Sequence, residues 1–335
     1  MTMPLAAFLA GLRNLPWVRI QEVFEHDLNL PAAFDLVLLE FSEILRDAVL
    51  NQRGPGLLGY FDHLELNFSL RGTPSYYPDS KVIRVNIGFC LFANELGATC
   101  DWLESILLSS NKQEIPIAEL MRLEAPTAVL RELRALFAVA DTGGLEVSGQ
   151  FGLANPIAMM MLRFALAHEI GHMIMSAESP RLQEHWKETA WSDYAGALDF
   201  AVQAGWIDNS QRFRLSRASL RAHVADQWVQ EVIADGIGFD TVLRLSHEND
   251  CEASQAYARL QVAVELFLHA VAILYRADLG TESHPPPLLR ACAMRETRRK
   301  VHRVGWEDFL TQYWGPGFIT DQLLSKTIPT LGARQ

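Results

Sequence analysis

The amino-acid sequence predicts a mainly α-helical protein of the α+β class, with one small antiparallel β-sheet. Two early stretches, 64–70 and 81–87, alternate apolar with polar side chains, which is the pattern of half-buried strands. Long unbranched apolar residues fill 156–175, as they do in a helix buried on nearly all sides. Apolar residues then recur at helical spacing from Leu220 to Phe239. The β-structure is therefore expected early in the chain and the long helices late.

The first half of the chain is expected to hold the sheet and several helices. A turn at Arg71 to Pro74 separates the two strands, so they are expected to pair in an antiparallel sheet. A break near Gly143 divides the chain into an N-terminal part, 1–143, and a helical part, 144–335, packed into the same unit. Helices are expected over 31–52, 89–110 and 115–139, short helical pieces over 180–217, and a long apolar helix over 255–279.

One five-residue string, His168-Glu169-Ile170-Gly171-His172, lies inside the apolar run. Asn155 and Pro156 are good start residues for a helix, which is expected to extend from about 156 to 176. A membrane span is the alternative for so apolar a segment. Arg163 and the string itself make lipid exposure costly, so no membrane span is expected.

The string carries side chains suited to a metal ion. At about 100° per residue, His172 returns to within about 40° of His168, and Glu169 lies about 100° away, so all three can converge. Two neutral imidazoles suit Zn²⁺, and a catalytic zinc site needs one more protein ligand and a water. The carboxylate between the histidines is placed to act as general base for that water. The string therefore predicts one catalytic zinc ion and a hydrolytic reaction.

The third ligand is expected downstream, at Glu231. Glu231 and Asp235 are four residues apart on a helical face distinct from the apolar one. In that geometry Glu231 would bind the metal, and Asp235 would accept the outer N–H of a liganding histidine. Gly236 and Gly238 would let this helix approach a neighbour closely. An exposed carboxylate pair on an amphipathic helix is the alternative, and His223, two turns earlier, is the reserve ligand.

A histidine in a proline-rich turn forms the third element. His284 precedes Pro285-Pro286-Pro287, so it is held in an extended turn directly before a helix. Such a histidine can donate to a developing oxyanion, or it can simply cap the following helix. Arg290, one to two turns into that helix, can hold an acidic partner or the substrate.

These three segments, in this order, resemble the gluzincin metallopeptidases, and most closely the group that contains the CAAX prenyl protease and the heat-shock protease HtpX. That group pairs an HExxH helix with a later ExxxD helix, and then a His-Pro turn with an arginine six residues after the histidine. The match runs from Pro156 to about Val301. A looser similarity extends to the soluble bacterial phage-exclusion peptidases, which also carry HExxH and no membrane spans.

The resemblance implies a zincin-like core in which the sheet lies above the motif helix and its edge strand pairs with an extended peptide. The CAAX protease and HtpX are membrane proteins, whereas this chain shows no convincing span, so the resemblance bears on the reaction rather than on the substrate class. The roles that it implies are zinc ligands at His168, His172 and Glu231, a base at Glu169, support from Asp235, and transition-state contacts from His284 with Arg290 nearby.

Composition narrows the partners and the compartment. The 335 residues carry a formal net charge of −11, and Arg298-Arg299-Lys300 is too short a basic cluster to offset it, so no nucleic-acid partner is expected. The four cysteines are spread out and form no CxxC, which favours a reducing, cytoplasmic compartment. The N-terminus has an apolar stretch with no basic region before it, so no secretory signal is expected.

Together these observations predict a soluble, cytoplasmic zinc metallopeptidase that hydrolyses a protein or peptide substrate, with Glu169 as general base. The alternative is a zincin-like scaffold that binds zinc for structure, or serves as a regulatory interaction protein, without turnover. Glu169 argues against the scaffold because a purely structural zinc site needs no acid/base carboxylate between its ligands. A third interpretation, chance motifs in a helical protein, requires three coincidences in the right order.

Overall fold

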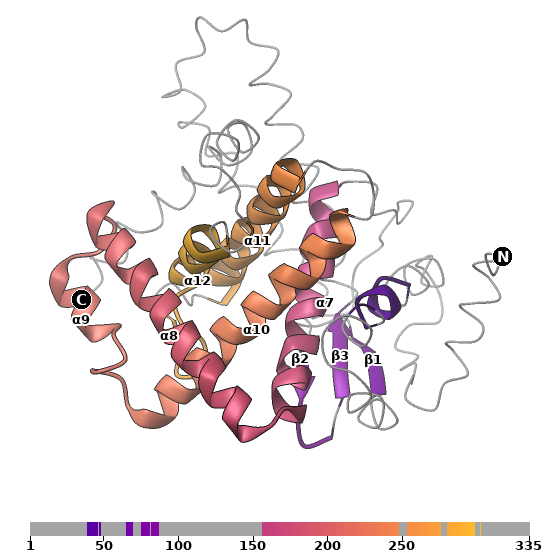
Figure 1. Cartoon of the computed structure of the whole chain (residues 1–335), viewed down its shortest axis with the longest axis horizontal. Coiled ribbons are helices and arrows are strands. Elements are labelled where there is room, and N and C mark those ends of the chain that lie inside the picture. The colour runs from indigo at the N-terminus through magenta and orange to yellow at the C-terminus, as the bar shows by residue number, and fades with distance from the viewer. Residues whose placement is uncertain are drawn as a thin grey trace, which may run out of the picture.

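The computed structural model describes residues 39–45, 47, 65–69, 75–80, 82–86, 156–247, 253–275, 280–298 and 302. This part is mainly helical with one small sheet, which confirms the α+β class (Figure 1). The boundary expected near Gly143 and the helices expected over 89–110 and 115–139 lie outside the described residues. The elements are β1 (Glu65–Ser69), β2 (Ser75–Tyr77), β3 (Val82–Asn86), α7 (Pro156–Ala177), α8 (Pro180–Gln203), α9 (Asn209–Arg214), α10 (Ala222–His247), α11 (Ala253–Tyr275), α12 (Pro287–Ala293) and the π-helix η3 (Met294–Arg298).

The sheet has three strands in the order β1-β3-β2 and is mixed. β2 runs antiparallel to β3, with Tyr76 opposite Ile83. β1 runs parallel to β3, with Leu66 opposite Ile83. The expected antiparallel pairing of the first and last strands was therefore wrong. A third strand follows the predicted turn, so the chain reverses twice between β1 and β3, and these two strands point the same way.

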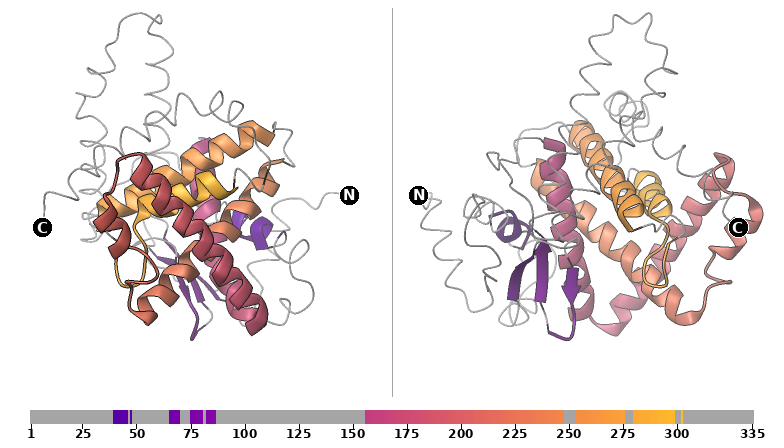
Figure 2. Two further views of the ribbon diagram at one scale, coloured as in Figure 1. Left: turned by 60° about the vertical axis from the view of Figure 1, so that its left-hand side comes forward. Right: turned by 180° about the vertical axis from the view of Figure 1, so that it is seen from behind.

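Helix α7 lies between the sheet and the other helices. Figures 1 and 2 show the sheet on one side of α7 and helices α8, α10, α11 and α12 on the other. Phe164 of α7 packs edge-on against Phe267 of α11, with ring centroids 5.8 Å apart. The bounds of α7 confirm the helix expected from about 156 to 176. Its central position explains why nearly every face of this helix is apolar.

Helices α7 and α10 approach each other closely because small residues meet at their contact. A Cβ added to Gly171 would lie 3.0 Å from the carbonyl oxygen of Ala234. A Cβ added to Gly238 would lie 2.9 Å from the backbone nitrogen of His168, which real Cβ atoms essentially never do. The close approach expected at Gly238 is confirmed, and the contact falls on the HExxH string itself.

Helix α8 packs against α10, which also contacts α7. Short helical pieces were expected over 180–217, but α8 is one helix of 24 residues, and only α9 is short. Polar residues such as Glu184, Glu188 and Ser192 lie on the exposed face of this one helix instead of forming turns. Tyr194 of α8 packs against Trp228 of α10, with ring centroids 6.1 Å apart. This cluster of buried aromatics holds α8 across the helix that carries Glu231.

By length and composition, α7 is the one helix in the described ranges that is long and apolar enough to cross a membrane. The protein buries 78% of its most apolar stretch inside the fold. A buried core helix has the same length and composition as a membrane span, so these features of α7 carry no conclusion about a membrane.

Candidate metal centre

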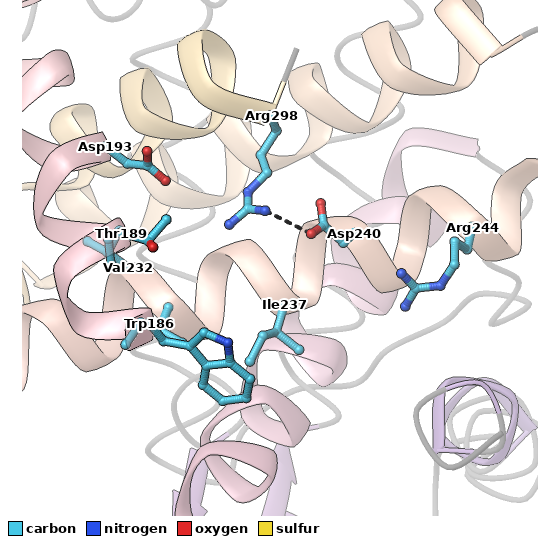
Figure 3. A pocket seen from close by; sticks show the side chains of 10 residues that line it. Trp186, Thr189, Asp193, Val232, Ile237, Asp240, Arg244 and Arg298 are labelled. Carbon is cyan, nitrogen blue, oxygen red and sulfur yellow. Dashed lines mark hydrogen bonds and ion pairs between the residues drawn. The ribbon is translucent and has the colours of Figure 1, made fainter. Parts of the chain in front are cut away.

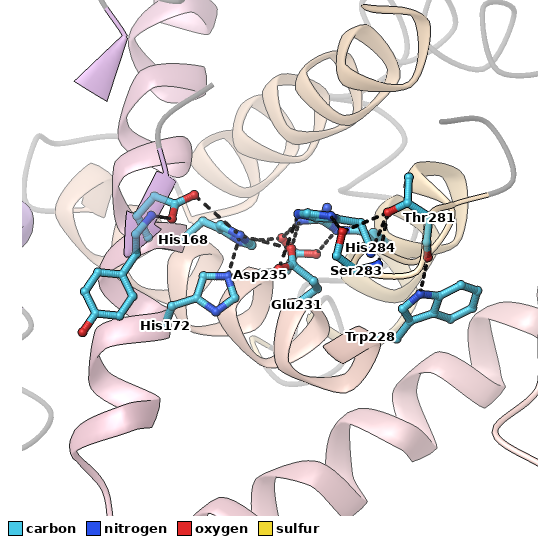
Figure 4. Close-up of polar contacts among 11 residues, drawn as sticks. His168, His172, Trp228, Glu231, Asp235, Thr281, Ser283 and His284 are labelled. Carbon is cyan, nitrogen blue, oxygen red and sulfur yellow. Dashed lines mark hydrogen bonds and ion pairs between the residues drawn. The ribbon is translucent and has the colours of Figure 1, made fainter. Parts of the chain in front are cut away.

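Two histidines of α7 and one carboxylate of α10 form the candidate metal centre. His168 Nε2 and His172 Nε2 lie 3.1 Å apart. Glu231 Oε2 lies 3.4 Å from His168 Nε2, and Glu231 Oε1 lies 3.2 Å from His172 Nε2. Figure 4 shows the three side chains converging between the two helices. The spacing of four residues puts both histidines on one face of α7, and the close helix contact brings Glu231 to that face.

These distances fit one ion bound by all three side chains. In a tetrahedral site with bonds of about 2.0 to 2.1 Å, two ligand atoms lie about 3.3 Å apart. One ligand atom from each side chain lies within 4.8 Å of the other two. Glu231 Oε2 is buried, yet no hydrogen bond reaches it from the described residues, which suits an oxygen whose partner is an ion. This cluster can hold a metal ion, as the motifs predicted.

The charge of the site favours a divalent cation. Three carboxylates and one guanidinium are buried here, which leaves a formal charge of −2 when the histidines are neutral; they are Glu169, Glu231, Asp235 and Arg290. Net charge in a buried place is costly unless an opposite charge compensates it. The same surplus of negative charge acts on the imidazole of His168. Burial alone would lower the pKa of His168, but Asp235 and Glu231 outweigh burial and raise that pKa to about 10.

Asp235 and Arg290 lie behind the histidines. Asp235 Oδ1 is 2.9 Å from His168 Nδ1, the ring nitrogen that faces away from the cluster. Arg290 donates through Nε and Nη2 to the two oxygens of Asp235, each at 2.7 Å. Burial opposes ionisation of Asp235, but Arg290 and His168 prevail and hold the pKa of Asp235 below its usual range. Arg290 therefore has an acidic partner, one of the two roles expected of it.

Glu231 is held ionised by the side chains around it. Burial opposes its ionisation, but His172, His168 and Arg290 outweigh burial and keep the pKa of Glu231 well below its usual range. Arg290 Nη2 lies 3.4 Å from Glu231 Oε2. An ionised carboxylate is the form that binds a metal ion, so the site keeps this group ready at neutral pH.

Glu169 faces the cluster from the side of the sheet. Its Oε1 lies 3.9 Å from His168 Nε2. Its Oε2 accepts a hydrogen bond of 2.5 Å from the backbone N–H of Tyr76 in β2. Burial raises the pKa of Glu169 above its ordinary value, against the effect of the two histidines. The sequence did not single out Tyr76, because its contribution is a backbone group and carries no side-chain signal.

His284 reaches the cluster from the opposite side. Its Nε2 lies 3.6 Å from Glu231 Oε1, and its side chain is half exposed. Burial lowers the pKa of His284, against the effect of Glu231. The seven residues singled out by the motifs therefore meet in one place. The reserve ligand His223 is exposed and lies outside this cluster.

Apart from the candidate metal centre, a pocket lies between α8, α10 and η3. It measures about 350 Å³, and Trp186, Asp193 and Asp240 are among its lining residues (Figure 3). Arg298 projects into it and donates to Asp240 at 2.8 Å. A Cβ at Gly236 would occupy the place of the Arg298 guanidinium, so this glycine makes room for an arginine rather than for a helix.

Comparison with known proteins finds no relative: no family model, no curated protein and no solved structure matches this chain. The likeness to gluzincins therefore depends on the motif residues and on their convergence in space. The activity that this likeness implies is accordingly a proposal.

Proposed function

We propose that this protein is a zinc-dependent peptidase that hydrolyses peptide bonds in a protein or peptide substrate. One observation carries the proposal. His168, His172 and Glu231 converge on a single point, and the carboxylate of Glu169 faces that point from the side. Two histidines, one carboxylate ligand and an adjacent carboxylate base are the groups that catalytic zinc sites of peptidases use.

The donor set favours zinc over harder cations. Two imidazole nitrogens and one carboxylate suit Zn²⁺ with a fourth position open, whereas Mg²⁺ and Ca²⁺ prefer oxygen ligands throughout. When bound, zinc would polarise the substrate carbonyl and lower the pKa of a coordinated water to about 7. The surplus charge of −2 described above fits a divalent ion.

Glu169 is proposed as the general base. It takes a proton from the attacking water while the water oxygen bonds to the peptide carbonyl carbon. The same carboxyl then gives that proton to the leaving nitrogen as the C–N bond breaks, so the products are a carboxylic acid and an amine. Burial raises the pKa of Glu169 toward neutrality, which brings its basicity closer to that of an efficient base at pH 7.

His284 and the sheet supply the remaining contacts. His284 reaches over the open side of the cluster, where its Nε2 can donate to the oxyanion that forms on the carbonyl oxygen. β2 lies at the edge of the described sheet and its Tyr76 N–H meets Glu169, so this strand lies beside the reacting groups. An extended substrate that pairs with β2 would bring its peptide bond to the cluster.

The test is Glu169→Gln, with zinc content and cleavage of an unfolded protein pool measured side by side. The variant is expected to keep about one zinc per chain and to lose cleavage by about 10²- to 10⁴-fold, the usual contribution of a general base. Glu184→Gln, at an exposed position on α8, is the matched control and should cleave normally. Cleavage retained by Glu169→Gln would remove this residue from the proposed role.

The second candidate is a zinc-binding scaffold without turnover. The observation that favours it is the Tyr76 N–H, which occupies one oxygen of the proposed base at 2.5 Å. A scaffold would contain zinc, yet it would show no chelator-sensitive cleavage over varied substrates and pH. Zinc analysis followed by incubation with and without chelator separates the two candidates.

A further inference from the structure

The loop that carries His284 is tied to the helix that carries Glu231. Gly280 has φ of +78°, and a Cβ there would lie 2.7 Å from the carbonyl oxygen of His284. Glycine therefore lets the loop close on itself, and the Thr281 N–H donates to that same carbonyl at 2.8 Å. Trp228, one turn before Glu231 on α10, donates its indole N–H to the Thr281 carbonyl at 2.8 Å.

Inside this loop, the Thr281 hydroxyl accepts two backbone hydrogen bonds. Its Oγ1 is 3.0 Å from the His284 nitrogen and 3.3 Å from the Ser283 nitrogen. A hydroxyl oxygen has two lone pairs and one proton. Both lone pairs face backbone donors, so the Thr281 proton is left for Ser283 Oγ, which lies 3.1 Å away.

Ser283 Oγ lies 2.7 Å from His284 Nδ1. When Ser283 accepts from Thr281, its own proton is available for donation to that nitrogen. With Nδ1 as the acceptor of this bond, a neutral His284 ring carries its proton on Nε2. That nitrogen is the one that faces the metal centre, 3.6 Å from Glu231 Oε1.

We propose that Thr281 and Ser283 are positioning residues that hold His284 with its proton on Nε2, aimed at the open side of the metal centre. The proposal rests on the peptidase function, because only there does a donor at this place assist a reaction. The half-exposed ring would otherwise be free to rotate or to turn its bare nitrogen inward. The two hydroxyls thus fix the orientation and the proton position of the His284 ring, as a carboxylate does for many active-site histidines.

Nitrogen NMR of the zinc-loaded full chain tests the proton position without any need for activity. With ¹⁵N-labelled histidine, and His284→Gln to assign the signal, Nδ1 is expected to be unprotonated and Nε2 protonated at pH 7.5. Ser283→Ala should shift the Nδ1 resonance away from that of a hydrogen-bonded acceptor, and Ser283→Thr should retain it. A proton found on Nδ1 of the parent protein overturns the proposal, whether or not the protein is a peptidase.

Kinetics test whether Ser283 acts through His284. His284→Ala should lower kcat by about 10²- to 10³-fold, the usual effect of removing an oxyanion donor. Ser283→Ala should lower kcat by about 10-fold with KM and zinc content unchanged, and Ser283→Thr should recover most of the loss. In the His284→Ala background, Ser283→Ala should have no further effect.

Ser192→Ala, at an exposed position on α8, is the control for the Ser283 variants and should leave kcat unchanged. Additive losses in the double variant would show that Ser283 acts independently of His284 and would overturn the proposal. If the parent protein shows no cleavage, the peptidase function fails, and the NMR measurement still decides where the proton lies.

Discussion

Two buried ion pairs in this protein use arginines only five positions apart, and they differ in what surrounds them. Arg295 of η3 contacts Glu265 at 2.7 Å, and Gln261 donates to the same carboxylate at 2.6 Å. Arg290 of α12 contacts Asp235 and a second carboxylate, that of Glu231. The metal centre thus holds three buried carboxylates beside one buried guanidinium. Burial of ions is therefore common to both, and surplus negative charge beside histidines marks the metal centre.

Removing one carboxylate from each ion-pair region should give the largest effects. The carboxylate of Glu231 is expected to bind the metal, and that of Glu265 to stabilise the fold. Glu231→Gln is expected to weaken zinc binding by more than about 100-fold, because a ligand is lost and not merely its support. Glu265→Gln removes the buried carboxylate that contacts the Arg295 guanidinium, so it should cost about 3–5 kcal/mol of folding free energy. Competition with a chromophoric chelator measures the first effect, and urea unfolding measures the second.

The folded fraction of Glu265→Gln should still bind one zinc per chain. Normal zinc affinity in Glu231→Gln would show that another group supplies the third ligand. Zinc loss in folded Glu265→Gln would show that the two regions are not independent.

Asp235→Asn should have the next largest effect on the metal. The amide keeps the shape of the side chain but loses the charge that contacts His168 Nδ1 and Arg290. Removal of such a supporting group typically lowers metal affinity by about 10- to 100-fold. Asp199→Asn, at an exposed position on α8, is the matched control. An Asp235→Asn protein with unchanged zinc affinity would contradict the role given to this carboxylate.

The contact between α7 and α10 can be probed with two glycines. Gly238→Ala places a Cβ 2.9 Å from the His168 nitrogen, so the helices must separate, at a cost of about 1–3 kcal/mol and with weaker zinc binding. Gly196→Ala on α8 meets no atom within 4 Å and should stabilise the protein by up to about 1 kcal/mol. Thermal unfolding with and without zinc measures both. If Gly238→Ala changed neither the unfolding free energy nor zinc binding, the contact between the two helices would tolerate separation.

The chelator-treated protein is also expected to show a pH dependence of its stability. Folding raises the pKa of His168 from 6.5 to about 10, so its contribution to stability is complete below about pH 6.5 and is lost as the pH rises toward 10. The unfolding free energy should therefore decrease in the order pH 6.5, 8 and 9.5. His168→Gln should flatten this slope, and so should bound zinc, because a liganding imidazole is neutral. An unchanged slope in His168→Gln would assign the pH dependence to another group.

Residues close in sequence were the ones whose arrangement could be predicted. The bounds of α7, the common face of His168 and His172, and the close approach at Gly238 all follow from helical periodicity and residue size. The convergence of these residues with Glu231 was expected only through the motif order, because no local rule spans the 58 residues between His172 and Glu231. The antiparallel pairing of the strands at 64–70 and 81–87 was predicted wrongly for the same reason: pairing depends on how the chain turns and packs.

The sequence by itself determined which side chains each helix presents, since a period of 3.6 residues sets that locally. It therefore specified two histidines and one carboxylate on α7, and a pair of carboxylates on α10. Only the tertiary structure decided which partners they meet. Arg290 donates to Asp235, and the Tyr76 N–H donates to Glu169 across 93 positions. Such partners depend on the packing of whole elements, where small shifts of backbone decide which donor reaches which acceptor.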